Sequence, residues 1–127
     1  MFSHVMVGAN SIEVSRQFYD ATFTALGYVT SFQDPMGRIF WLGSTGSFAI
    51  TQPINGQPAT SGNGMTIGFT CDSVEKVNAW HSAGIANGGT AVESPPGVRD
   101  SGTPLARYLA YLRDPAGNKL CAMHLIK

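Results

Sequence analysis

Two stretches decide the fold: HVMVGANSIEVSRQFYDATFTALG, residues 4–27, and TIGFTCDSVEKVNAWHSAGIANGG, residues 66–89. They align without a gap when one is shifted onto the other, and Gly27 then meets Gly89. In each stretch a short apolar run precedes apolar residues at helical spacing, which predicts a strand followed by an amphipathic helix. A repeated supersecondary unit of this kind indicates an internal duplication, so the chain divides into two related modules.

Signals for a helix start occur at the same place in both modules. Asn10 and Asp72 stand at the expected N-cap positions, and Glu13 and Glu75 follow three residues later. This pattern predicts a capping box, in which side chains satisfy the free N–H groups of the first turn. A glycine closes each predicted helix, because glycine adopts the left-handed conformation that often ends a helix.

Strand patterns follow each predicted helix, so that each module reads βαβββ. We expect module 1 at about 1–52, a linker rich in Gly, Pro and Asn at about 53–63, and module 2 at about 64–127, within one domain that spans 1–127. One helix can cover only one face of each sheet. The other faces are expected to line a concave trough, where small molecules commonly bind. After the helices, the expected strands are 28–33, 38–42 and 48–51 in module 1, and 90–93, 107–113 and 119–125 in module 2, with a loop at 94–104.

Composition excludes several classes of partner. Eight Lys and Arg balance eight Asp and Glu, and no basic run occurs, so we expect no nucleic-acid partner. No apolar run reaches the length of about 20 residues that spans a membrane, so no membrane partner is expected. The first ten residues lack the pattern of a secretory leader. The two cysteines, Cys71 and Cys121, form no metal-binding spacing, and we predict a cytoplasmic protein with both thiols reduced.

Short motifs give the chain a resemblance to a known family. They are FSHV at 2–5, FYD at 18–20 and LGY at 26–28 in module 1, with PPGVR at 95–99 and DPAGNK at 114–119 in module 2. These stretches resemble the vicinal-oxygen-chelate superfamily of glyoxalases, bleomycin-resistance proteins and extradiol dioxygenases. The resemblance implies an α+β fold in which two tandem βαβββ modules form an open, curved mixed-sheet barrel with a concave site.

The resemblance also implies where a metal ion would bind. Many members of the family hold a divalent metal, usually with His and Glu from the first and last strands of each module. In this chain the first-strand positions are His4 and Thr66, and the last-strand positions fall near Ile50 and at Cys121. Only His4 is a usual ligand, and a catalytic metal commonly needs three protein ligands. We therefore expect either no cofactor or one divalent metal anchored by His4.

Several residues are candidates for the site, each with a structural alternative. His4 could act as a general base or lone metal ligand, or could be an inert histidine. Arg99 could clamp a carboxylate or phosphate, or could be a solvated loop residue. Tyr108 and Tyr111 face opposite sides of one strand, so only one can stack on a ligand. Cys121 could be a nucleophile, although no activating neighbour adjoins it in sequence. The predicted substrate-binding residues are Met6, Phe40, Ile50, Thr66, Arg99, Tyr108, Cys121 and Met123.

Two functions from different classes follow. The first is a glyoxalase-like enzyme, a lyase, isomerase or dioxygenase, that acts on a small oxygenated molecule. The second is a metal-free protein of the bleomycin-resistance type that binds a small molecule in an apolar, aromatic cavity, and an accessory structural domain is a third reading. The resemblance also implies a homodimer, and the low content of charged residues, 13%, is compatible with an apolar interface.

Overall fold

The computed structural model describes residues 1–126. The chain alternates strands and helices in the order expected of two βαβββ modules, with one additional strand in the second. Module 1 contains β1 (His4–Gly8), α1 (Ile12–Leu26), β2 (Ser31–Gln33), β3 (Ile39–Leu42) and β4 (Ser47–Thr51). Module 2 contains β5 (Ile67–Thr70), α2 (Val74–Ala86), β6 (Thr90–Ala91), β7 (Gly97–Arg99), β8 (Arg107–Arg113) and β9 (Lys119–Leu125).

Each module forms its own mixed sheet. The first has the strand order β1-β4-β3-β2, and the second has the order β5-β9-β8-β6, with β7 also paired to β8. In both, the first strand runs parallel to the last, and the remaining pairs are antiparallel. The predicted α+β class is therefore confirmed. The two sheets stay separate within residues 1–126 and form no closed barrel there.

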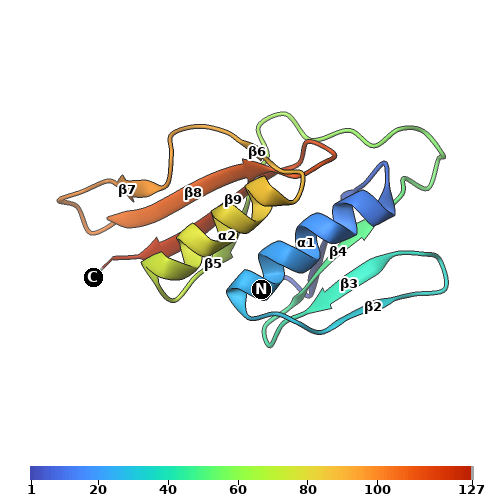
Figure 1. Ribbon diagram of the computed structural model, residues 1–127, viewed down its shortest axis with the longest axis horizontal. Helices are drawn as coiled ribbons and strands as arrows, with labels where there is room; N and C mark the ends of the chain where they lie inside the picture. The colour runs from blue at the N-terminus through green and yellow to red at the C-terminus, as the bar shows by residue number, and fades with distance from the viewer. Residues whose placement is uncertain (127) are drawn as a thin grey trace.

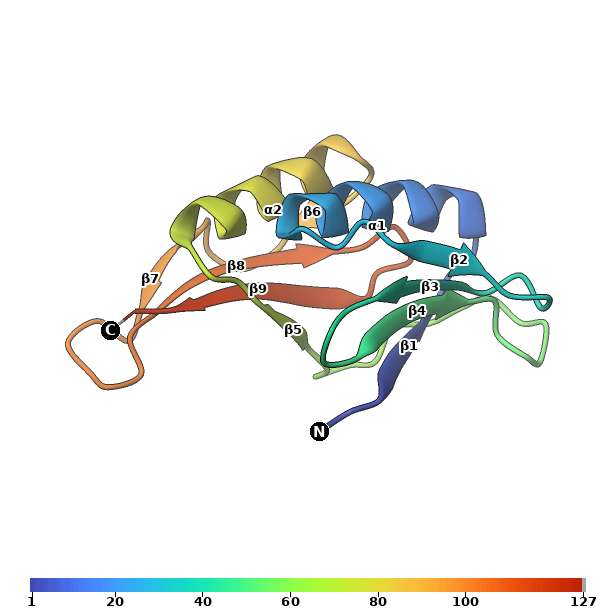
Figure 2. The same ribbon diagram turned by 90° about the horizontal axis from the view of Figure 1, so that it is seen from below.

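Both helices lie on the same side of the strands. Figure 1 shows α1 and α2 next to each other in front of the two sheets, and Figure 2 shows the opposite side of the strand layer without a helix. Between helices and strands lies one continuous core of buried apolar side chains from both modules. At its centre the Tyr19 ring packs against Phe18, Phe48 and Trp41. Aromatic contacts of this kind dominate the burial that holds the layers together.

A buried polar cluster also joins the two modules. The Tyr19 hydroxyl of α1 donates a hydrogen bond of 2.5 Å to Asp114 Oδ2, in the turn between β8 and β9. Asn118 Nδ2 donates both to the same carboxylate and to the Gly8 carbonyl oxygen at the end of β1. Two backbone N–H groups of the turn donate to Asp114 Oδ1. A buried carboxylate is stable only with such partners, so this cluster fixes one module against the other.

The helix caps differ by one residue from the prediction. Ser11 and Ser73 are the N-caps, and their hydroxyl oxygens accept from the N–H groups three residues later. Asn10 instead accepts a hydrogen bond from the Ala59 N–H and so ties the linker to module 1. Gly27 ends α1 with φ of 92°, as predicted, whereas α2 is followed by a left-handed glycine at 88 rather than 89.

The predicted loop at 94–104 contains a strand that the sequence pattern did not reveal. β7 is three residues long and pairs with the N-terminal part of β8. Its Gly-Val-Arg sequence lacks the run of β-branched or aromatic residues that indicates a strand. Within residues 1–126, no helix has the length and apolar character needed to cross a membrane.

Candidate functional site

The strand side opposite the helices is the candidate site, and we call it the open face. Along each strand, alternate residues point to opposite sides. Val5 and Val7 pack on the core, and so do Phe48 and Ile50, which places the residues between them on the open face. The same alternation puts Leu120 and Ala122 in the core and Cys121 and Met123 on the open face.

In module 1 one row of the open face is apolar. Met6 is paired with Ala49, Ala49 with Phe40, and Phe40 with Phe32, so these residues form one row across four strands. The rings of Phe32 and Phe40 stack with centroids 5.1 Å apart. The Arg38 guanidinium lies 5.9 Å from the centroid of the Phe40 ring. This row offers a flat apolar ligand a stacking surface at the outer strands.

The equivalent row in module 2 is polar. Gly68 is paired with Cys121, and Cys121 with Tyr111. The Lys119 ammonium lies 5.1 Å from the centroid of the Tyr111 ring and forms an ion pair with Glu93. This row therefore presents a hydroxyl and a thiol where the equivalent row of module 1 presents aromatic and aliphatic groups, and in both modules a cation lies over an aromatic ring of the row.

The thiol and the hydroxyl of this row are both protonated at neutral pH. Burial raises the pKa of Cys121, and it outweighs the opposing effects of the Tyr111 hydroxyl, Arg107 and Lys119. Burial, followed by the neighbouring Cys121 and Glu93, raises the pKa of Tyr111. A nucleophilic cysteine needs a lowered pKa, so Cys121 does not have the environment of one.

Two predicted site residues lie on the helix side of the sheets instead. Ile50 is fully buried beneath the helices, and the strand register shows that Ala49 is the equivalent of Cys121. Tyr108 points toward α2, where its hydroxyl donates a 2.8 Å hydrogen bond to Asn78. Of the two tyrosines of β8, Tyr111 is the one on the open face. Each error is one of strand alternation, because a shift by one residue moves a side chain to the other side.

The remaining predicted site residues, Thr66, Met123 and Arg99, do not lie together. Thr66 is exposed just before β5, and Met123 is half-buried in β9 on the open face. Arg99, at the end of β7, donates from Nη2 to the carbonyl oxygens of Ser94 and Pro95, and so braces its own loop. The structure thus brings Met6 and Phe40 together in one row and Cys121 and Met123 together in β9.

His4 lies beside a cavity at the seam between the modules. The cavity measures about 330 Å³ and lies where β1 and β5 approach each other, with His4 and Thr70 among the residues that line it. Much of the remaining lining is aromatic, including Phe23 and Phe69. The His4 side chain is exposed, and its Nδ1 lies 2.8 Å from Ser3 Oγ. A volume of this size is at the lower end for small-molecule sites.

The residues at the family's metal positions do not fit a divalent metal site. With the register corrected, the four positions are His4, Thr66, Ala49 and Cys121, of which only His4 is a usual ligand. No group of three His, Cys, Asp or Glu side chains with the geometry of a metal site occurs in residues 1–126. A catalytic metal commonly needs three protein ligands, and this donor set falls short of that number.

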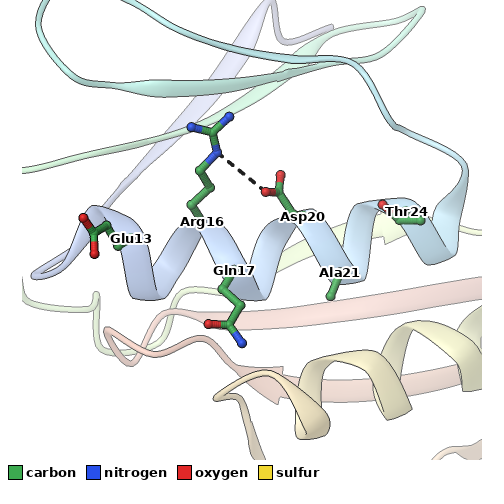
Figure 3. A pocket seen from close by; sticks show the side chains of 6 residues that line it. All are labelled: Glu13, Arg16, Gln17, Asp20, Ala21 and Thr24. Carbon is green, nitrogen blue, oxygen red and sulfur yellow. Dashed lines mark ion pairs between the residues drawn. The ribbon is translucent and has the colours of Figure 1, made fainter.

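A hollow of about 600 Å³ along the outer side of α1 is not a binding site of the same kind. In Figure 3 the labelled side chains around this hollow all come from this one helix, and the dashed line marks the ion pair between Arg16 and Asp20. The two ionic groups of this pair are 3.6 Å apart. Gln17 points toward α2, where its amide donates to the Asn87 side chain. Because one helix alone forms this surface, it cannot enclose a ligand.

Comparison with known proteins establishes the family. The family model for the Glyoxalase/Bleomycin resistance protein/Dioxygenase superfamily matches residues 1–122. The chain belongs to this superfamily. A glyoxalase/bleomycin resistance protein from Albidiferax ferrireducens T118 is 57% identical in sequence, with a TM-score of 0.92 and coverage of 98% of each chain. A search of curated proteins gave no match.

More distant members of the superfamily share the fold alone. A glyoxalase/bleomycin resistance protein/dioxygenase family enzyme from Burkholderia phytofirmans PsJN is 20% identical, with a TM-score of 0.73 and 98% of each chain covered. A lactoylglutathione lyase from Agrobacterium tumefaciens is 18% identical, with a TM-score of 0.66, and the match covers 98% of this chain and 92% of that one. Enzymes thus occur among proteins of this fold, and the reaction of a given member depends on its site residues.

Proposed function

We propose that the protein binds a small molecule on the open face without a metal ion, in the manner of a sequestering protein. The observation that carries this proposal is the row of Met6, Ala49, Phe40 and Phe32, which the strand pairing brings together. Phe32 is 46% exposed although it is a large apolar residue in a strand. Met6 and Phe40 are half-buried and Ala49 is buried between them, so the uncovered apolar surface centres on the Phe32 and Phe40 rings, and such a surface commonly marks a binding site.

An aromatic ligand tests this proposal directly. We expect Phe40→Ala to weaken binding of an uncharged naphthalene derivative, naphthamide, by about tenfold, since a stacked aromatic contact contributes about 1 kcal/mol beyond its buried area. Binding would be followed by calorimetry, with methyl NMR of Met6 to locate the ligand. Val14→Ala, on the exposed side of α1, is the matched control. Equal affinity of the Phe40→Ala variant, or perturbation of other methyl groups only, would contradict the proposal.

A glyoxalase-like enzyme acting on a small oxygenated molecule, as a lyase, isomerase or dioxygenase, is the second candidate. It is favoured by His4, whose imidazole lies beside the seam cavity and is reached by solvent. A histidine in this position could accept a proton from a substrate bound in the cavity. Metal content by elemental analysis separates the candidates: one equivalent of divalent metal, lost in His4→Ala, would favour the enzyme over the sequestering protein.

The proposal includes a homodimer in the cytoplasm. Phe2, Val29 and Leu42 of module 1 are apolar side chains outside the Met6 row that solvent reaches in the single chain, and a second copy could cover them. Cys71 and Cys121 are unpaired, which suits a reducing compartment. Light scattering at micromolar concentration tests the dimer, and the mass of a single chain would contradict it.

A further inference from the structure

The same five-residue turn occurs twice in the chain. Residues 34–38 read DPMGR between β2 and β3, and residues 114–118 read DPAGN between β8 and β9. In both turns the aspartate Oδ1 accepts from the backbone N–H groups of the third and fifth residues, and its Oδ2 accepts from the side chain of the fifth. The fifth side chain, Arg38 or Asn118, therefore decides what each turn offers beyond itself.

The protein itself uses the donors of the turn in module 2. Asn118 lies in the buried cluster between the modules, where its Nδ2 donates to Asp114 Oδ2 and to the Gly8 carbonyl oxygen. An amide nitrogen of this kind has two N–H groups, so both are engaged. This turn links the modules, and its Asn118 side chain has no donor left for a ligand.

The turn of module 1 leaves donors unused. Arg38 Nε donates to Asp34 Oδ2 at 2.5 Å, which restrains the orientation of the guanidinium. Among residues 1–126, the terminal nitrogens Nη1 and Nη2 of Arg38 have no hydrogen-bond acceptor. These two nitrogens carry four N–H groups in a rigid planar arrangement. The Arg38 side chain is 34% exposed, so a ligand can reach these groups from solvent.

These donors lie beside the Met6 row. Arg38 alternates with the buried Ile39, so it lies on the same side of the sheet as Phe40, and its guanidinium is the one that approaches the Phe40 ring. A cavity of about 660 Å³ adjoins the row, with both Met6 and Arg38 among the residues that line it. This volume is within the range of small-molecule sites. A ligand stacked on Phe40 would therefore have the guanidinium and the cavity next to it.

The charges around the cavity favour a neutral acceptor. Glu13 lines the cavity from the first turn of α1, and Asp34 already balances the charge of Arg38. An anionic ligand would meet two carboxylates and one guanidinium, whereas a neutral carbonyl oxygen can accept from the guanidinium without this repulsion. A cationic group would compete with Arg38 for the face of the Phe40 ring. The other polar residues of the lining are uncharged: Asn10, Ser11, Gln33, Thr51 and Gln52.

We propose that the ligand of the open face is an aromatic molecule with a neutral carbonyl oxygen, an amide or a ketone, which accepts from the terminal N–H groups of Arg38 while its ring lies on Phe40. This inference rests on the proposed function, because it names the class of ligand that the same row binds. A charged donor gives a stronger hydrogen bond than a neutral one, so the carbonyl group adds specificity to an otherwise apolar contact.

The test uses three probes of one shape: naphthamide with a neutral carbonyl, naphthoate with an anionic group, and methylnaphthalene with no acceptor. We expect the wild type to bind naphthamide about threefold or more tightly than naphthoate. Arg38→Met should weaken naphthamide binding by about tenfold and alter methylnaphthalene binding by less than about twofold, because it removes the donors and keeps an apolar chain beside Phe40. Arg16→Met is the matched control, because Arg16 also pairs with an aspartate four positions away.

A second variant keeps a cation in the turn. Arg38→Lys retains the charge beside Asp34, but a single ammonium cannot both hold Asp34 and present a planar pair of donors. We expect this variant to fold as the wild type does, by circular dichroism, and to bind naphthamide at least about threefold more weakly.

The outcomes separate the inference from the proposed function. Naphthamide affinity that is unchanged in Arg38→Lys and Arg38→Met would overturn the inference, and methylnaphthalene binding that still depends on Phe40 would leave the proposed function standing. Tighter binding of naphthoate than of naphthamide would also overturn the inference, since the preferred ligand would then be an anion. Absence of binding by all three probes would remove both.

Discussion

The two modules match each other on the side that faces the helices and differ on the open face. Val5, Phe48 and Trp41 correspond in register to Ile67, Leu120 and Leu112, and all six pack on the shared core. On the open face, Met6, Ala49 and Phe40 correspond to Gly68, Cys121 and Tyr111. The core side of a duplicated module is constrained by packing, whereas the uncovered side is free to take residues of other chemistry.

The register on which this comparison depends can be tested by one pair of substitutions. We expect Ile50→Glu to destabilise the protein by more than about 4 kcal/mol, since it places a carboxylate in the apolar core. Leu42→Glu should cost much less, about 1–2 kcal/mol, because Leu42 alternates with the buried Trp41 and its 39% exposed side chain can extend from the open face toward water. Urea denaturation followed by circular dichroism measures both. Similar losses for the two variants would mean that the assignment of the faces is wrong.

Removal of the hydrogen bond that links the two modules is expected to have the next largest effect on stability. Tyr19→Phe removes one of the donors to the buried Asp114 carboxylate and leaves the ring packing in place. The expected loss in the free energy of unfolding is about 1–3 kcal/mol, the cost of an unsatisfied buried acceptor. Tyr28→Phe, at an exposed ring in the same module, is the control. A two-state transition in both variants would show that the modules unfold together. An unchanged free energy of unfolding in Tyr19→Phe would mean that the bond to Asp114 does not hold the modules together.

The same tyrosine gives the stability a dependence on alkaline pH. Burial, and then the Asp114 carboxylate, raise the pKa of Tyr19 above its ordinary value of 10.0. A raised pKa in the folded state means that the contribution is complete below the unfolded pKa and is lost as the pH rises above it. The wild-type protein should therefore lose stability as the pH rises above about 10, and Tyr19→Phe should lose less over that range. Parallel pH profiles for the two proteins would contradict this.

The sequence predicted the duplication and the order of elements well, because both depend on local patterns. Apolar spacing and turn residues marked the helices and most of the strands to within a few residues. The site was predicted less well, since Ile50 and Tyr108 were assigned to the wrong face. A strand's limits are not visible in its sequence with single-residue accuracy, and one residue decides the side on which a side chain lies.

Other features of the site depend on contacts between distant segments. Asp114 meets Tyr19 across 95 positions of the chain, and Glu93 meets Lys119 from a segment with strained backbone. No local pattern signals such a meeting. Tyr111 could have been preferred to Tyr108 by extending the alternation from Cys121 through the hairpin, since the Asp-Pro turn fixes the pairing of β8 with β9.

The smallest expected effect concerns Gly68, the counterpart of Met6. A Cβ atom at this position would meet no atom within 4 Å, and its φ is outside the left-handed region, so alanine fits without strain. Gly68→Ala should stabilise the protein by about 0.5–1 kcal/mol, since it reduces the freedom of the unfolded chain. Gly8→Ala is the contrasting variant, because its Cβ would lie 2.9 Å from the Ala59 Cβ of the linker and force a shift. Thermal denaturation of both variants measures these changes in stability. If only Gly68→Ala stabilises the protein, the row of module 2 has room for a side chain where module 1 has Met6. A loss of stability in Gly68→Ala would show that this space is already filled.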